Sequence, residues 1–99
     1  MSEIEIENEI QAKGLNAPRL KPVDIDQTIV SEQYYVFPKT TLTICALTLK
    51  NGFVVTGESA SASPENFDKE IGRRIARENA RNKIWSFEGY SLRNKLVGL

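Results

Sequence analysis

The chain has 99 residues, the length of a single small domain spanning residues 1–99, and its 40% hydrophobic and 26% charged residues exclude a disordered protein. One cysteine, Cys45, and no histidine exclude an intramolecular disulfide and a cysteine-rich zinc site, and they remove the usual general base of enzymes. The 13 basic and 13 acidic residues balance, but residues 1–33 carry seven acids and three bases, whereas residues 69–99 carry three acids and eight bases. We therefore expect a protein that is not an enzyme and needs no metal or cofactor. The basic residues 69–99 either bind an anion or form a charged surface that is exposed to solvent.

The first 20 residues carry no clear helix signals. Ile4 and Ile6 are interleaved with glutamates, and Gly14 and Pro18 follow, so residues 1–20 are predicted to be either a short edge strand or a flexible acidic tail. The acidic start differs from the basic start of a secretory signal, and no apolar run approaches the roughly 20 residues of a membrane span. We therefore expect no export and no membrane partner.

A short helix is predicted over residues 22–33. Pro22 suits a first helical position, two aspartates follow in the first turn, and Ile25 and Ile29 recur at helical spacing. The aromatic and β-branched residues 34–37 then predict a short strand, which we place at a sheet edge because a proline ends it.

Residues 41–50 predict a second strand that is apolar on both faces, as expected of a strand covered on both sides. Asn51-Gly52 separates it from residues 53–56, and Asn-Gly between two such runs is the strongest short-range signal of a β-hairpin. A two-residue turn of this kind would place Leu47 opposite Thr56.

A long helix is predicted from Pro64 to about Ser86, because Ser63 suits the N-cap and Pro64 the first helical position. Gly89 predicts a break or kink, followed by a second helical piece that ends near Leu96. The short helix, a small antiparallel sheet with an Asn-Gly hairpin, and a long, broken C-terminal helix together make an α+β domain.

The long helix is predicted to bury a line of small residues. Gly72, Ala76 and Ala80 follow one another at spacings of four, and small residues let another backbone come close, either the sheet or a symmetry-related helix. The wider apolar arc around them adds Ile71, Ile75, Ile84 and Phe87. Gly57 in the hairpin likewise marks a bulge or a close backbone approach. Asn79 falls inside the arc, where it makes either a structural hydrogen bond or a ligand contact.

The opposite side of this helix carries what we call the arginine ridge. Arg74, Arg77 and Arg81 follow one another at spacings of three and four, and Arg73 flanks them. Either these side chains pair with glutamates and keep the helix soluble, or they form a clamp for phosphate, since a planar guanidinium grips two phosphate oxygens at once.

Further ligand contacts are predicted near the ridge. Free backbone N–H groups around Asn66, at the start of the helix, would favour an anion, and an aromatic side chain such as Phe67 or Tyr90 would stack on a base. The aromatic side chains that could build such a wall are Tyr34, Tyr35, Phe53, Phe67, Trp85, Phe87 and Tyr90. Most of them must pack in the core of so small a domain.

Several short motifs of this chain occur together in one protein family. They are Asn51-Gly52-Phe53, Gly57–Ala60, Ser63–Asp68, Ile71-Gly72-Arg73, Ile75-Ala76, Trp85 and Glu88-Gly89-Tyr90. The stretch over residues 47–93 that contains them resembles the small phage proteins of the gene-forty-nine/gene-sixty-six family. Two positions depart from that pattern, since Ser61 and Ser86 stand where many members have cysteine and proline. The resemblance implies a phage protein that works in the host cytoplasm.

The layout of a small sheet followed by C-terminal helices is similar to that of the phage sponges that block Thoeris defence. Those proteins sequester signals of the cyclic ADP-ribose type, and some hold the cyclic oligonucleotides of CBASS. They are oligomers with arginine-lined pockets and no catalytic turnover. The resemblance implies an anti-defence protein that binds a small anionic nucleotide without cleaving it, and the arginine ridge agrees with that implication.

Two other functions stay open from the sequence. The ridge could follow the phosphates of a nucleic acid, although the zero net charge argues against that partner. The acidic residues 1–20 could instead bind a host protein by mimicking nucleic acid. In each case the two-sided strand and the small-residue line predict a homo-oligomer built from two-fold dimers.

Overall fold

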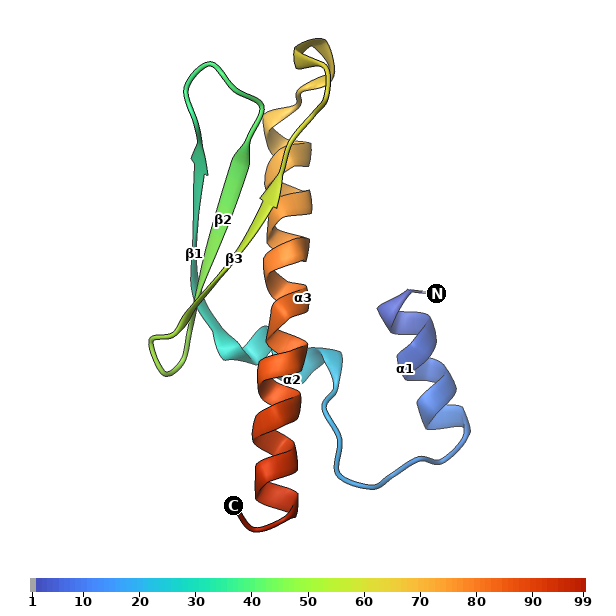
Figure 1. The fold of residues 1–99 in the computed structure, drawn as a ribbon. Helices are drawn as coiled ribbons and strands as arrows, with labels where there is room; N and C mark the ends of the chain where they lie inside the picture. The colour runs from blue at the N-terminus through green and yellow to red at the C-terminus, as the bar shows by residue number, and fades with distance from the viewer. Residues whose placement is uncertain (1) are drawn as a thin grey trace.

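The computed structural model describes residues 2–99, in which three strands form one antiparallel sheet of order β1-β2-β3 (Figure 1). The elements are α1 (Glu3–Ala12), α2 (Pro22–Thr28), β1 (Ile29–Val36), β2 (Thr43–Leu49), β3 (Val54–Ser59), a 3-10 turn (Pro64–Asn66) and α3 (Lys69–Leu96). The long helix α3 lies along one face of the sheet and continues past it toward the C-terminus (Figure 1). This is the predicted α+β architecture. Over the described residues, no helix is long and apolar enough to cross a membrane.

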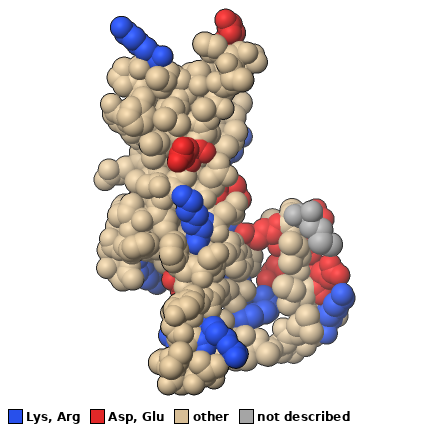
Figure 2. Space-filling view, viewed as in Figure 1, with Lys and Arg blue, Asp and Glu red and all other residues tan. Residues whose placement is uncertain are grey.

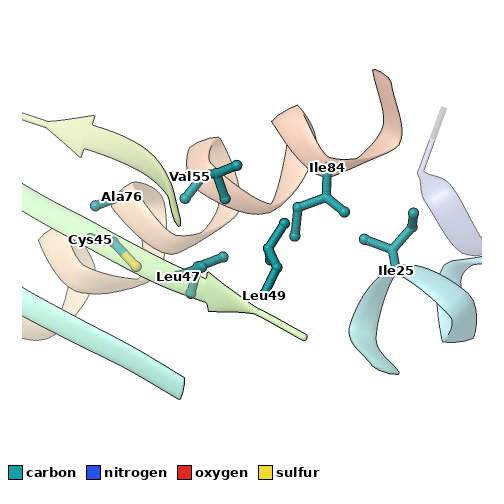
Figure 3. Close-up of a cluster of buried hydrophobic side chains, with 8 residues drawn as sticks. Ile25, Cys45, Leu47, Leu49, Val55, Ala76 and Ile84 are labelled. Carbon is teal, nitrogen blue, oxygen red and sulfur yellow. The ribbon is translucent and has the colours of Figure 1, made fainter. Parts of the chain in front are cut away.

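The core lies between the sheet and α3 (Figure 3). Its buried members are Ile25, Cys45, Leu47, Leu49, Val55, Ala76, Ala80 and Ile84. The sheet and the helix approach backbone to backbone at Gly57, where an added Cβ would lie 2.2 Å from the Ala80 nitrogen and 2.3 Å from the Ala76 oxygen. The small-residue line therefore serves the sheet of the same chain, which was one of the two predicted uses.

The buried face of α3 is narrower than the predicted apolar arc. Ile71 is 50% exposed and Ile75 is 48% exposed, and Phe87 is also largely exposed. Asn79, predicted to lie inside the arc, is exposed and donates a 2.8 Å hydrogen bond from Nδ2 to the Glu58 carbonyl of β3. Because β3 is an edge strand, the described chain has no further strand beside it to cover the two isoleucines.

The hairpin forms at Asn51-Gly52, but its register differs by one residue from the prediction. Leu47 lies opposite Val55, not Thr56. The Leu49 N–H donates to the Phe53 carbonyl and the Leu49 carbonyl accepts from the Gly52 N–H, which closes a three-residue loop. A type I′ turn needs positive φ at both central residues, yet only Gly52 has it, at 89°. The Asn51 side chain instead accepts a hydrogen bond from the Phe53 N–H, which stabilises a turn with a glycine bulge.

The predicted helix over residues 22–33 is shorter, because α2 ends at Thr28 and β1 begins at Ile29. β1 pairs with β2 from Ile29↔Leu49 to Val36↔Thr43, with an irregularity between Ile29 and Ser31. The Lys50 N–H also donates to the Thr28 carbonyl. The cross-strand pairing of β-branched and aromatic residues outweighs the helical spacing that the isoleucines suggested.

The N-terminal segment is a helix, so the prediction of an edge strand or a flexible tail for residues 1–20 is wrong over Glu3–Ala12. The Ser2 side chain caps α1 by accepting from the Glu5 N–H, and two glutamates in its first turn favour the positive end of the helix dipole. No residue of α1 is buried, and Ile4 is 71% exposed. The alternation of isoleucine and glutamate therefore reflects no buried strand face.

The long helix begins five residues later than predicted and does not break. Residues 64–66 form a single 3-10 turn without a side-chain cap at Ser63, and Asp68 caps α3 by accepting from the Ile71 N–H. The helix then passes through Gly89 and ends at Leu96. Side chains before and after Gly89 continue the helix, so this glycine lowers helix stability without ending it.

Candidate functional site

Arg81, the last member of the arginine ridge, is buried and already bound to two carboxylates. Its Nη1 and Nη2 donate to the Glu3 carboxylate at 2.7 and 2.9 Å, and its Nε donates to Asp26 at 2.7 Å. These contacts tie α1 and α2 to α3. The hydrogen bonds with Glu3, ahead of those with Asp26, raise the pKa of Arg81 above its usual value. Arg81 is therefore charged and its donors are engaged within the chain.

Arg77 is engaged in the same way, with a partner in the sheet. Its Nε donates to the Glu32 carboxylate of β1 at 2.7 Å, and this hydrogen bond lowers the pKa of Glu32 while it raises that of Arg77. Glu32 also accepts from the Tyr34 hydroxyl at 3.2 Å. Burial, together with the nearby Cys45 and Glu32, raises the pKa of Tyr34 to about 12. This cluster fixes β1 against α3.

The two remaining ridge arginines stay more open. The guanidinium of Arg73 lies 5.3 Å from the centre of the Tyr34 ring, which is a cation–π contact. Arg74 lies 4.0 Å from Glu70 on its own helix, and its side chain is 74% exposed. The predicted pairing with glutamates of the same helix therefore occurs only loosely, while the strong partners of the ridge come from α1, α2 and β1.

The other predicted ligand contacts lie at opposite ends of α3. The Asn66 N–H donates to the Ser63 carbonyl and the Phe67 N–H donates to the Pro64 carbonyl, so neither is free for an anion. Phe67 precedes α3, whereas Tyr90 lies near its other end and is 73% exposed. At about 1.5 Å per helical residue these two rings are roughly 30 Å apart. The structure therefore does not bring Asn66, Phe67 and Tyr90 together around one ligand.

A groove between the hairpin turn, α2 and the C-terminal half of α3 gathers a different set of side chains. Its volume is about 530 Å³. The lining residues are Asp24, Gln27, Thr28, Leu49, Lys50, Asn51, Phe53, Phe87, Glu88 and Ser91. We call it the hairpin groove. This volume lies within the range of roughly 300–1,000 Å³ that is typical of small-ligand pockets.

The hairpin groove is lined by both aromatic and polar side chains. Phe53 and Phe87 pack edge to face with their ring centres 5.4 Å apart, and they are 53% and 49% exposed. Lys50 brings one positive charge to the groove and Asp24 and Glu88 bring two carboxylates, while the amides of Gln27 and Asn51 bring donors and acceptors. Such a set can stack on a flat ring, hydrogen-bond its edge and hold one anionic group.

Sequence reasoning named both phenylalanines as possible stacking residues but did not bring them together. Phe87 was assigned to the buried arc of the helix, and Phe53 to a strand. Asn51 and Phe53 of one family motif and Glu88 of another line the groove. The convergence of two separate motifs was the signal that could have located it.

On the face that Figure 2 shows, the charges do not form one basic patch. Figure 2 shows acidic side chains gathered over α1, while basic side chains are spread along the rest of that face. Among residues 2–99 there is also no group of three or more acidic or cysteine side chains placed to hold a metal ion. Because it brings aromatic, amide and cationic side chains together, the hairpin groove is our candidate site for a small organic ligand.

Comparison with known proteins places the chain in a family. A family model described as Phage protein (N4 Gp49/phage Sf6 gene 66) family matches residues 20–96. No curated protein and no solved structure matches this chain. The family match begins after α1 and extends to the end of α3, so it includes the hairpin groove and the arginine ridge but not Glu3. Because the model covers well over half of the sequence, this chain belongs to the N4 Gp49/Sf6 gene 66 family of phage proteins.

Proposed function

We propose that this phage protein binds a small anionic nucleotide and sequesters it without cleaving it. The nucleotide would be a host immune signal of the cyclic ADP-ribose type or a cyclic oligonucleotide, which would make the protein an anti-defence factor of the host cytoplasm. The observation that carries the proposal is the pair of half-exposed rings, Phe53 and Phe87, in a groove of about 530 Å³ that also holds Lys50.

Each part of a nucleotide finds a matching group in the hairpin groove. A base would stack on Phe53 or Phe87, its edge or the ribose hydroxyls would bond the amides of Gln27 and Asn51, and a phosphate would meet Lys50. The carboxylates of Asp24 and Glu88 would accept hydrogen bonds from amino or hydroxyl groups. The absence of histidine in the sequence supports binding without hydrolysis, because the usual general base is missing.

The arginine ridge stays a prediction as a phosphate clamp. A ligand that used Arg77 or Arg81 would have to displace Glu32, or Glu3 and Asp26, from hydrogen bonds of 2.7 to 2.9 Å. Arg73 and Arg74 need no such exchange with distant carboxylates. A ligand in the hairpin groove and a ligand on the arginine ridge would therefore contact different residues, and substitutions can distinguish the two binding modes.

The test is titration calorimetry with a panel of cyclic ADP-ribose isomers and cyclic dinucleotides, followed by chromatography of the released ligand. We expect an intact ligand at fixed stoichiometry, and Phe53→Ala weakens its binding by about tenfold or more, the range typical of a lost base stack. Lys50→Ala weakens binding as well, whereas Arg74→Ala, which removes an exposed cation outside the groove, has no effect. The groove proposal fails if only the Arg74 change weakens binding, and the nucleotide proposal fails if no member of the panel binds or if a bound one is cleaved.

A further inference from the structure

The face of the sheet opposite α3 carries apolar side chains that nothing in the described chain covers. The helices lie along the other face or beyond the ends of the strands (Figure 1). Because successive side chains of a strand alternate, Ile44, Ala46 and Thr48 of β2 point away from α3, while their neighbours point toward it. We call this surface the outer face of the sheet.

The outer face continues from β2 onto both edge strands. Tyr35 pairs with Ile44 on one side and Val54 pairs with Thr48 on the other. Tyr35 is 55% exposed and Val54 is 47% exposed. The Tyr35 ring also packs edge to face with Phe37, whose ring centre lies 4.8 Å away. All three strands therefore bring apolar side chains to this face, and the polar side chains of Gln33, Thr56 and Glu58 lie among them.

This surface differs from an ordinary solvated sheet face. The water-facing side of an antiparallel sheet is normally polar, yet β2 places no charged side chain there. The sequence prediction that β2 is covered on both sides is wrong for the single chain, because the α3 side is buried and the outer side is only partly so. An apolar central strand with one open face needs a second layer.

The whole molecule also exposes more surface than a folded monomer of its size. Its accessible surface is 7104 Å², against about 5,700 Å² expected for a compact monomer of 11.1 kDa. Its radius of gyration is 16.3 Å, against roughly 13 Å for a compact chain of this length. The excess is about 1,400 Å² over the whole elongated molecule, which measures 49 × 31 × 18 Å, and a standard interface buries roughly 800 Å² of each partner.

We propose that the outer face of the sheet is the interface with a second copy of this chain. Two outer faces would stack across a two-fold axis as a sheet-on-sheet sandwich, with Tyr35, Ile44 and Val54 meeting their counterparts. Glu58 of β3 is the one charged side chain that the three strands place on this face, so a second copy fits it better than a partner of opposite charge. The small-residue line of α3 is already used by the sheet, which leaves the outer face as the remaining predicted contact.

Sedimentation velocity over a range of concentrations tests this interface. We expect the parent protein to have twice the mass of the 11.1 kDa chain. Val54→Glu and Tyr35→Glu place like charges against each other in the sandwich, so each gives the mass of one chain with an unchanged circular dichroism spectrum. Tyr90→Glu is the matched control, because it alters a more exposed ring on α3, and it leaves the dimer intact.

Two results would overturn the proposal. The first is a parent protein that stays a single chain at every concentration, which would assign the outer face to another kind of partner. The second is an assembly whose mass is unchanged by both outer-face substitutions or is reduced by Tyr90→Glu. The proposal does not depend on nucleotide binding, which calorimetry measures separately on the same variants.

Discussion

The Glu3 carboxylate accepts two hydrogen bonds from the Arg81 guanidinium, across 78 positions of the sequence. The indole Nε1 of Trp85, one turn further along α3, lies 3.3 Å from the same carboxylate. Arg81 also holds Asp26 of α2, so one buried cation joins three helices. Since α1 has no buried residue, these polar contacts rather than apolar packing hold its first turn in place.

We therefore expect Glu3→Ala to release α1 from the rest of the domain. Hydrogen bonds to charged groups contribute about 1.5–3 kcal/mol, and less where the side chain is partly exposed, as Glu3 is. A loss of about 1–2 kcal/mol would leave α1 largely detached. Trp85 is the single tryptophan, so its fluorescence should shift to longer wavelength, and amides of residues 3–12 should exchange faster.

The matched control for this prediction is Glu5→Ala. Glu5 lies in the same first turn of α1, and its side chain is exposed and makes no hydrogen bond or ion pair in the described structure. Glu5→Ala should leave both the tryptophan fluorescence and the amide exchange rates of α1 unchanged. Equal effects of the two substitutions would show that α1 is held by helix propensity and not by Arg81.

Two glycines in regular elements should respond in opposite ways to alanine. At Gly57 the new Cβ meets backbone atoms of α3 at 2.2 and 2.3 Å, so the sheet and the helix must separate. We expect Gly57→Ala to lower the free energy of unfolding by about 1–3 kcal/mol or more. No neighbouring atom would lie within 4 Å of a Cβ added at Gly89, and this residue is inside α3. Gly89→Ala should therefore raise the free energy of unfolding by roughly 1 kcal/mol.

Urea denaturation of the two variants measures both effects. Because the sheet contact at Gly57 is part of the core, the urea concentration at half-unfolding should fall for Gly57→Ala and rise for Gly89→Ala. The dependence of the free energy of unfolding on urea concentration should change little. A stable Gly57→Ala protein would contradict the close approach of β3 and α3. A Gly89→Ala protein that is less stable would show that a second chain or a ligand approaches the helix at this position.

The sheet and the small-residue line were predictable because their signals are local. Asn51-Gly52 between two apolar runs requires only a tight turn, and the spacing of Ala76 and Ala80 follows from the helix period alone. The exact register was not predictable, since it depends on whether Asn51 adopts positive φ or bonds the Phe53 N–H instead. The choice between helix and strand at Ile29 likewise depends on its partner, Leu49, twenty positions away.

The candidate site was less accessible to sequence reasoning. The arginine ridge was predicted on the side of α3 opposite its buried line, but Arg81 is itself buried. The carboxylates that engage the ridge come from Glu3, Asp26 and Glu32 on three other elements. Helix periodicity contains no information about such distant partners. Exposure of Phe87 similarly depends on the sheet ending before this part of α3, a property of the packed molecule (Figure 1).

Acid should loosen the contact between α1 and the loop that follows it. Arg19 donates to both oxygens of Glu7 at 2.7 and 2.8 Å, and with help from Gln11 these hydrogen bonds lower the pKa of Glu7 from 4.5 to about 2. A lowered pKa means that the contact is fully stabilising above pH 4.5 and is lost as the pH falls toward 2. The carboxyl carbon resonance of Glu7 should titrate with a midpoint near 2, and at a higher pH in Arg19→Ala, where the hydrogen bond from Gln11 remains. A midpoint near 4.5 in the parent protein would show that the ion pair is not formed in solution.

The thiol of Cys45 should be unreactive in the folded protein. Cys45 is fully buried between β2 and α3, and burial raises the pKa of its thiol, so the reactive thiolate is scarce even at alkaline pH. A colorimetric disulfide reagent should detect no thiol without denaturant and one per chain in concentrated urea. A cysteine introduced by Ser86→Cys, at an exposed position of α3, should react at once under both conditions and serves as the control. Rapid reaction of Cys45 without denaturant would mean that the sheet separates from α3 far more often than a core of this kind allows.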